Sequence, residues 1–294
     1  MPPKKANLFP IFAELRSLVN DRILDALERG IIPWKRPWTG RLPKNYATGK
    51  EYRGVNILTL SIQEMLGGYS SPFWMTYNQA NNQGGYIKKG EKATYIVFSD
   101  TKVKEIEKPD GSKEEKVFHF VRSYPVFNWE QTENVPKKED GPILDPDRDL
   151  IEVCDSVLSG MTNQPNYRES GSRAYYMPKE DLVNLPPIET FKTTEGYVST
   201  KWHEYGHCTG HVSRLNRPGI METAAFGGED YSFEELVAEL TSAYLCAKNG
   251  IDNTIENSSA YIQSWLRTLK DDRTTLLKAS GKAMTAVEYI TQVA

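Results

Sequence analysis

"KWHEYGHCTGH", at residues 201–211, contains three of the four histidines in this chain of 294 residues. His203 and His207 are four positions apart, so on an α-helix both imidazoles leave the same face. Glu204 lies between them. In this HExxH arrangement two neutral imidazoles can hold Zn²⁺ while the glutamate acts on a metal-bound water. The stretch therefore predicts a helical metal site in which His203 and His207 are ligands and Glu204 is the general base.

The residues around the motif predict where its helix begins and ends, and they limit the choice of a third ligand. We expect Thr200 to be the N-cap and Gly210 to stop the helix. A catalytic zinc site takes three protein ligands and leaves a fourth position for water. His211 is the nearest candidate, although it follows the expected helix end. Ser213 occupies the place of the third histidine in the longer HExxHxxGxxH pattern, which excludes that pattern.

"YSFEELVAELTSAYL", at residues 231–245, offers further candidate ligands. Glu235 and Glu239 are four residues apart and share one helix face, in a helix apolar enough to pack against the first. The pair would equally fit a solvated acidic face if the histidine motif were absent. The pattern resembles that of the gluzincins, and this resemblance implies that Glu235 is the third ligand and that Glu239 orients a ligand histidine. Glu234 stands where those proteins often have asparagine, and Glu229 and Glu239 are the alternative ligands.

Composition limits the class of protein. Apolar residues make up 39% of the chain and charged residues 26%, which is typical of a globular protein. No apolar run reaches the roughly 18 residues of a spanning helix, and the N-terminus lacks a secretory pattern. The three cysteines are far apart and unpaired by spacing, which favours reduced thiols and a cytoplasmic location without membrane contact. No CxxC pair accompanies the histidines, which excludes zinc nucleobase deaminases.

The charge is distributed unevenly along the chain. Residues 1–140 contain 22 Lys and Arg against 17 Asp and Glu, whereas the remaining residues contain 14 against 22. A basic half beside an acidic half predicts a polyanionic partner for the first half. Chance scatter of surface charge is the alternative explanation.

Aromatic side chains alternate with basic ones in the basic half. Unpaired bases expose their faces for stacking and phosphates attract cations, so this composition favours single-stranded nucleic acid; a duplex-reading helix is not evident. The glycines of "NQGGYIKKGEK" (82–92) would let the backbone approach phosphates. The same residues could instead cover a small core and carry solvated charge. The candidate DNA-binding residues are Trp34, Lys35, Arg36, Trp38, Lys44, Tyr46, Tyr52, Arg53, Trp74, Lys88, Lys89 and Lys92.

The chain divides most naturally at "NVPKKEDGPILDPDRD" (134–149), whose composition cannot bury a core. We predict an α+β fold of two domains, residues 1–138 and 150–294, joined by a linker at 139–149. "KPDGSKEEK" (108–116) should form the tip of a hairpin. The strand-like "RAYYMP" (173–178) could pair with an extended peptide. Expected helices span residues 8–30, 147–159, 232–248, 257–269 and a final stretch ending near 291.

Five stretches together resemble the ArdC-type antirestriction proteins of conjugative plasmids: "IPWKRPW", "NYATGKEYRGVNILTL", "FWMTYNQANNQGGYIKKGEKAT", "KWHEYGHCTGHVSRL" and "FEELVAELTSAYL". The N-terminal part is also similar to the leading region of TraC-type plasmid primases. The resemblance implies an N-terminal α+β domain that binds single-stranded DNA and a mainly helical, zincin-like metallopeptidase domain. It further implies protection of incoming plasmid DNA from restriction enzymes.

The resemblance leaves the role and identity of the metal open. Zn²⁺ is the expected ion, and two imidazoles with one carboxylate also accommodate Mn²⁺ or Co²⁺. One alternative is a DNA-shielding protein whose metal is structural and catalyses no hydrolysis. Another is an ordinary regulatory protease with an unrelated N-terminal domain. Neither the residues nor the resemblance identifies a peptide substrate.

Overall fold

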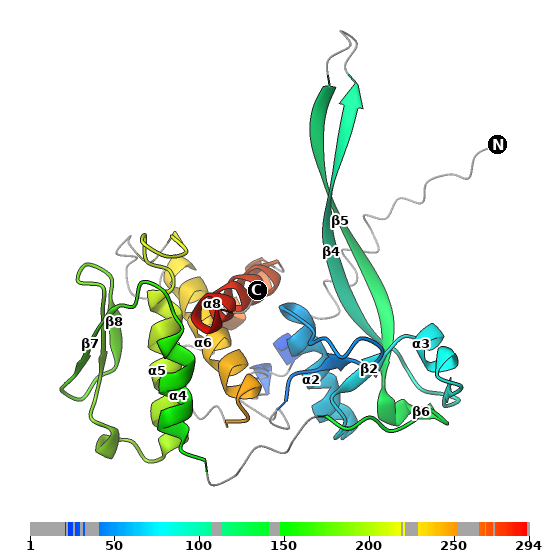
Figure 1. The fold of residues 1–294 in the computed structure, drawn as a ribbon, viewed down its shortest axis with the longest axis horizontal. Helices are drawn as coiled ribbons and strands as arrows, with labels where there is room; N and C mark the ends of the chain where they lie inside the picture. The colour runs from blue at the N-terminus through cyan, green and yellow to red at the C-terminus, as the bar shows by residue number, and fades with distance from the viewer. Residues whose placement is uncertain are drawn as a thin grey trace.

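The computed structural model describes residues 41–107, 113–140, 148–218, 220, 229–251 and 274–292, with parts of 21–32 and 265–272. Within these ranges the fold is α+β, as predicted, with the longest strands in the N-terminal half and most of the helices in the C-terminal half (Figure 1). No helix of this part of the chain is long and apolar enough to cross a membrane.

A four-stranded sheet forms the centre of the N-terminal half, in the order β1-β2-β5-β4. Its strands are β1 (Lys44–Asn45), β2 (Phe73–Met75), β4 (Thr94–Glu107) and β5 (Lys113–Asn128). β4 and β5 pair from Thr94 opposite Val126 to Glu107 opposite Lys113, and they project from the body as a two-stranded ribbon (Figure 1). The hairpin expected around residues 108–116 is thus confirmed, although 108–112 lie outside the described residues.

Two helices and a small second sheet surround the base of the ribbon. They are α2 (Val55–Gly67), α3 (Tyr77–Asn82), and β3 (Tyr86–Ile87) paired with β6 (Thr132–Glu133), which follows the 3-10 turn η1 (Trp129–Gln131). The Asn56 side chain, in the first turn of α2, accepts from the N–H of Val97 at 2.8 Å and donates to its C=O at 2.7 Å. The Asn56 amide therefore satisfies the N–H and C=O groups of Val97 on the edge strand β4, with which another strand could otherwise pair.

The C-terminal half packs helices beside a three-stranded sheet of order β7-β9-β8. Its elements are α4 (Leu150–Ser159), β7 (Asn166–Glu169), β8 (Tyr175–Met177), β9 (Leu182–Leu185), η2 (Ile188–Thr190), α5 (Thr194–Cys208), α6 (Glu229–Lys248) and α8 (Thr275–Thr291). The helices expected near 147–159, at 232–248 and up to about 291 are confirmed. Most of those expected at 8–30 and 257–269 lie outside the described residues.

The start of the HExxH helix differs from the prediction. α5 begins at Thr194, and the side chain of Thr193 accepts a hydrogen bond from the N–H of Gly196 at 3.0 Å. Thr200, predicted as the N-cap, lies inside the helix, so that prediction was wrong. Both Thr193 and Thr200 have a side chain that can cap a helix. A start at Thr193 also places Glu195 in the first turn, where the helix dipole favours an acidic residue.

One hydrophobic core runs through both halves of the chain. Val55, Ile57 and Leu58 of α2 belong to the same buried cluster as Leu240 of α6 and Leu276 of α8. Two smaller clusters lie wholly in the N-terminal half, built respectively around Tyr46, Phe73, Met75, Ala80 and Val135, and around Leu60, Trp74 and Val126. The proposed linker therefore separates two stretches of sequence whose apolar side chains pack together.

Candidate metal centre

Packing of α5 against α6 brings the predicted metal ligands together. The Nε2 atoms of His203 and His207 are 3.1 Å apart. The carboxylate of Glu235 lies 3.5 Å from the first and 3.6 Å from the second. Donor atoms bound at about 2.0–2.2 Å to a tetrahedral ion would lie about 3.3–3.6 Å from one another. The three side chains therefore fit a divalent cation, and one donor atom from each lies within 4.8 Å of the others.

Gly206 permits the close approach of the two helices. A Cβ at this position would lie 3.1 Å from the Cα and 3.3 Å from the carbonyl oxygen of Ala238 in α6. Such contacts are tighter than side chains ordinarily accept, so a larger residue would push α6 away from α5. The glycine inside the HExxH motif thus sets the spacing at which Glu235 meets the two histidines.

Each ligand histidine faces a second carboxylate through its other ring nitrogen. Nδ1 of His203 lies 3.4 Å from Glu239, and Nδ1 of His207 lies 3.6 Å from Glu234. A proton on each Nδ1 leaves the Nε2 lone pair directed towards Glu235, as a metal ligand requires. The geometry therefore favours Glu239 as an orienting residue. The same geometry favours Glu234 as a second orienting residue, which faces His207 from the position where the gluzincins often have asparagine.

A buried arginine holds Glu234 in place. Arg217 donates to the two carboxylate oxygens of Glu234, at 3.1 Å from Nε and 2.5 Å from Nη2. It also donates to the carbonyl of Gly206 at 2.7 Å and to the hydroxyl of Thr209 at 2.6 Å. Burial alone would raise the pKa of Glu234, but hydrogen bonds from His207 and Arg217 hold it below its ordinary value. Sequence reasoning missed Arg217 because it lies in the loop after α5, outside any motif.

The histidines and the glutamate of the cluster shift one another's pKa values in opposite directions. Burial alone would lower the pKa of His203, but hydrogen bonds to Glu235 and Glu239 raise it well above its ordinary value. Burial opposes protonation of His207 as well, yet the charge of Glu235 raises its pKa to about 9. The same histidines lower the pKa of Glu235 despite its burial. A cation at this site replaces the protons on the inner nitrogens, so binding releases protons.

Glu204 is buried beside the edge strand β8. Burial raises the pKa of its carboxyl, and the N–H of Tyr176 in β8 donates a hydrogen bond to it. β8 pairs with β9 on one side only among the described strands. The hydroxyl of Tyr176 donates to Asp181 at 2.8 Å, and Arg214 bonds Asp181 as well as the carbonyl of Cys208 at the end of α5. This network holds β8 against the end of the motif helix.

Of the remaining candidate ligands, His211 lies outside the cluster. His211 follows the end of α5, where its Nδ1 lies 2.8 Å from the hydroxyl of Ser213 and 3.9 Å from Asp181. Among the described residues the metal-ligand cluster contains Glu235 and does not contain His211. Glu229 is the first residue of α6, but its side chain is not among those described.

The predicted DNA-binding residues do not form one surface. Trp74 has 0% exposure, and its Nε1 donates to Glu64 at 2.8 Å, while Tyr46 is buried and donates to the carbonyl of Pro136. No base can stack on either ring, so these two predictions were wrong: aromatic composition alone cannot distinguish a core ring from a stacking ring. The prediction for Trp34, Lys35, Arg36 and Trp38 lies outside the described residues.

The other predicted cations and Tyr52 differ in accessibility. Lys44 pairs with Asp140 at 2.6 Å, and Arg53 pairs with Glu288. Tyr52 is half-buried and accepts a hydrogen bond from Asn45. The side chains of Lys88, Lys89 and Lys92 are all exposed, as is that of Arg53.

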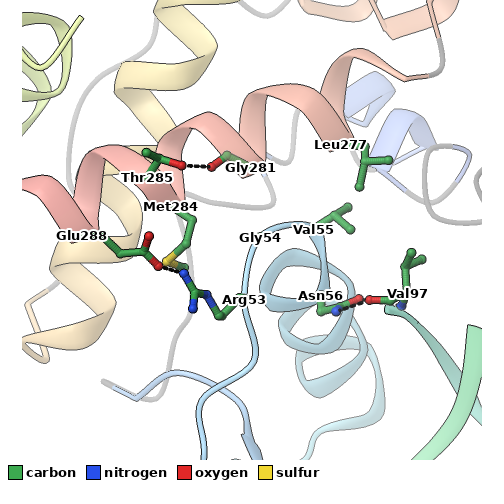
Figure 2. Close-up of a pocket in the computed structure, with 10 residues that line it drawn as sticks. All are labelled: Arg53, Gly54, Val55, Asn56, Val97, Leu277, Gly281, Met284, Thr285 and Glu288. Atoms are coloured by element: carbon green, nitrogen blue, oxygen red, sulfur yellow. Dashed lines mark hydrogen bonds and ion pairs between the residues drawn. The ribbon is translucent and has the colours of Figure 1, made fainter. Parts of the chain in front are cut away.

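A cavity of about 350 Å³ lies away from the metal cluster, between the start of α2, β4 and α8 (Figure 2). Arg53 and Glu288 form an ion pair on its wall, and Asn56 is bonded to Val97 (Figure 2). Because these polar groups satisfy one another, the cavity presents few free donors or acceptors to a ligand.

The paired helices, with HExxH on one and a glutamate on the other, define the class of the C-terminal half. Residues 159–282 match the family of zincin-like metallopeptidases, and residues 13–127 match the N-terminal domain of the anti-restriction factor ArdC. The chain belongs to the ArdC family of antirestriction proteins.

The similarity extends over nearly the whole chain. The crystal structure of the antirestriction ArdC protein from plasmid R388 in its metal-free state is 35% identical, with a TM-score of 0.76, and the match covers 94% of this chain and 96% of that one. Its Mn(II)-bound structure matches at 34% identity, with a TM-score of 0.73, over 94% of this chain and 97% of that one. The uncharacterized protein y4eC of Sinorhizobium fredii (strain NBRC 101917 / NGR234) is 31% identical over 92% of this chain and 90% of its own length.

Two DNA primases TraC of Escherichia coli are each 32% identical to this chain, over 99% and 92% of its length. The chain spans only 20% and 26% of the lengths of those primases. The Mn(II)-bound relative and the zincin-like match together point to a divalent metal at the His203, His207 and Glu235 cluster.

Proposed function

We propose that this protein binds single-stranded DNA through residues 1–138 and protects incoming conjugative DNA from restriction. In this proposal residues 150–294, beyond a linker at 139–149, bind a divalent cation through His203, His207 and Glu235. The observation that carries the metal part is the convergence of these three donors at the spacing of a tetrahedral ion. Family membership over nearly the whole chain supports the antirestriction part.

The proposed ion is Zn²⁺, with Mn²⁺ or Co²⁺ as the alternatives that this donor set accommodates. When bound, such an ion polarises a carbonyl and acidifies water. Glu204, held by the N–H of Tyr176, would take a proton from the attacking water and pass it to the leaving amine. The edge of β8 that pairs with none of the described strands would align an extended peptide beside Glu204 by adding a strand.

We further propose that the protein acts in the cytoplasm. Cys154, Cys208 and Cys246 are all buried, and none of them forms a disulfide with another described residue. Burial raises the pKa of Cys154 to about 12, so this thiol stays protonated and unreactive. Buried cysteines without disulfides suit a reducing compartment.

The decisive experiment compares wild type with Glu204→Gln in a conjugation assay, in which a plasmid enters a restricting recipient at matched expression of either protein. Loss of protection by a variant that still folds, binds DNA and binds metal supports hydrolysis as part of the mechanism. Full protection by Glu204→Gln shows that DNA binding suffices and that the metal is structural. A wild type that gives no protection overturns the antirestriction proposal. An electrophoretic shift without preference for single strands over duplex would indicate an ordinary protease with an unrelated N-terminal domain.

A further inference from the structure

Exposed tyrosines and lysines are concentrated in residues 77–95, here called the tyrosine–lysine segment. Tyr77 is 53% exposed, Tyr86 44% and Tyr95 45%. The exposed side chains of Lys88, Lys89 and Lys92 lie between the last two tyrosines in sequence. A single exposed aromatic ring is ordinary, but three exposed rings and three exposed cations within 19 consecutive residues are a concentrated aromatic and basic stretch.

The backbone of the tyrosine–lysine segment is firmly held. The segment contains α3 and β3, and β3 pairs with β6. Gly85 packs so tightly that a Cβ there would lie 2.4 Å from the side chain of Val135. The buried side chain of Gln131 donates to the carboxylate of Glu91 at 2.8 Å and to the carbonyl of Lys92 at 3.1 Å. Exposed rings on a fixed backbone lose little conformational freedom when a ligand binds.

The lysines of the segment keep their positive charge available. Lys88 donates to the uncharged carbonyl of Glu130 at 2.8 Å, and none of Lys88, Lys89 and Lys92 forms an ion pair within the described part of the chain. The nearby carboxylate of Glu130 is engaged by the N–H groups of Ser70 and Ser71. These lysines differ in this respect from Lys44 and Arg53, whose charges are neutralised by Asp140 and Glu288.

Two glycines open the backbone of the segment to solvent. Gly84 and Gly90 have φ angles of +80° and +93°, and no atom lies within 4 Å of where their Cβ would be. These left-handed conformations suit glycine, and the missing side chain leaves room for a phosphate to approach the main chain. The segment therefore combines stacking surfaces, free cations and accessible backbone.

We propose that the tyrosine–lysine segment is the surface that binds single-stranded DNA, with Tyr77, Tyr86 and Tyr95 stacking on unpaired bases and Lys88, Lys89 and Lys92 contacting phosphates. This inference rests on the proposed function, in which the N-terminal half binds single strands. Duplex DNA hides the base faces that tyrosines need, so the surface selects unpaired strands. α3 packs on β3 at the base of the ribbon, which keeps the start and middle of the segment together (Figure 1).

Fluorescence anisotropy of the full chain with a labelled oligo(dT) tests the proposal. We expect each of Tyr77→Ala, Tyr86→Ala and Tyr95→Ala to weaken binding by about 5- to 150-fold. The Lys89→Gln/Lys92→Gln variant should reduce the slope of log K against log salt concentration by about 1.4, since each phosphate contact on a single strand contributes about 0.7. Tyr167→Ala, which removes a ring of 42% exposure in the C-terminal half, and Lys179→Gln/Lys282→Gln are the matched controls and should bind as wild type does.

The outcomes separate this inference from the proposed function. If wild type does not bind oligo(dT), the proposed function fails. If wild type binds and the segment variants, with unchanged melting temperature, bind equally well, the single strand lies elsewhere and only this inference is overturned. Variants that bind DNA normally but lose protection in the conjugation assay would assign the segment to a protein contact, which also overturns it.

Discussion

Replacing Arg217 with methionine tests whether the buried arginine orients the metal site. Arg217→Met keeps an apolar stem of similar length but removes every hydrogen bond to Glu234, Gly206 and Thr209. Glu234 would remain as a buried carboxylate without its counter-ion, and breaking a buried pair in this way costs about 3–5 kcal/mol. The carboxylate would also lose its fixed position beside Nδ1 of His207. Loss of such an orienting partner lowers metal affinity by about 10- to 100-fold.

A double-mutant cycle with Glu234→Gln isolates the interaction. The double variant lacks the buried charge, so we expect it to be more stable than Arg217→Met alone by about 2 kcal/mol or more. All three variants should bind metal more weakly, because each of them disturbs the carboxylate facing His207. Urea unfolding measures the stabilities, and titration calorimetry with Mn(II) measures the affinities. Arg173→Met, a change at an exposed arginine of the same half, is the matched control.

Two results would refute the reasoning. Stability of Arg217→Met within about 1 kcal/mol of wild type would show that the pair is not effectively buried. A large loss of stability with unchanged Mn(II) affinity would show that the network supports the fold without orienting His207.

Three further predictions follow from buried groups and from the metal. Trp74→Ala should lower the free energy of unfolding by about 3–5 kcal/mol in urea, because the ring has 0% exposure; normal stability with weakened DNA binding would place the ring on the surface instead. Burial raises the pKa of Glu64 from 4.5 to about 7, against the hydrogen bond from Trp74. The folded state therefore binds this proton more tightly, so its contribution is present below pH 4.5 and is lost as the pH rises towards 7. Between these limits, the free energy of unfolding of Glu64→Gln relative to that of wild type should rise by about 3 kcal/mol. Unfolding of both proteins at pH 5 and pH 8 measures this, and the same stability difference at both pH values would contradict the prediction. Chelation by EDTA should lower the melting temperature of metal-loaded wild type and leave His203→Ala unaffected, since an ion at 100 times its Kd adds about 2.7 kcal/mol; equal shifts in both proteins would argue for another binding site.

Features encoded within one element could be predicted from the sequence. The spacing of His203 and His207 fixes a shared helix face, and the Pro-Asp-Gly sequence at 109–111 predicts a hairpin, which the pairing of β4 with β5 confirms. The choice of Glu235 required the resemblance to gluzincins, because spacing alone does not say which acidic residue of a second helix meets the first. Distances between α5 and α6 now favour the same residue.

Features that depend on tertiary packing could not be predicted from the sequence. Tyr46 lies between Lys44 and Lys50 in the sequence and Trp74 lies in an uncharged stretch, yet both rings fill small cores created when β1, β2 and β5 assemble. Arg217 reaches the metal centre only because the chain after α5 folds back onto Gly206 and Thr209. Local composition carries no signal for either arrangement, since the partners are distant in sequence or outside any motif.

Because α2, α6 and α8 share one buried core, we expect the two halves to unfold as one cooperative unit. A cut in the proposed linker would expose the apolar faces of Val55, Ile57 and Leu58 on one fragment and their partners on the other. Separate fragments would therefore tend to aggregate, and a ligand bound to either half would protect both from unfolding. The unit should also persist intact when it is fused into larger proteins, and one of the TraC primases matches 99% of this chain within a fifth of its own length.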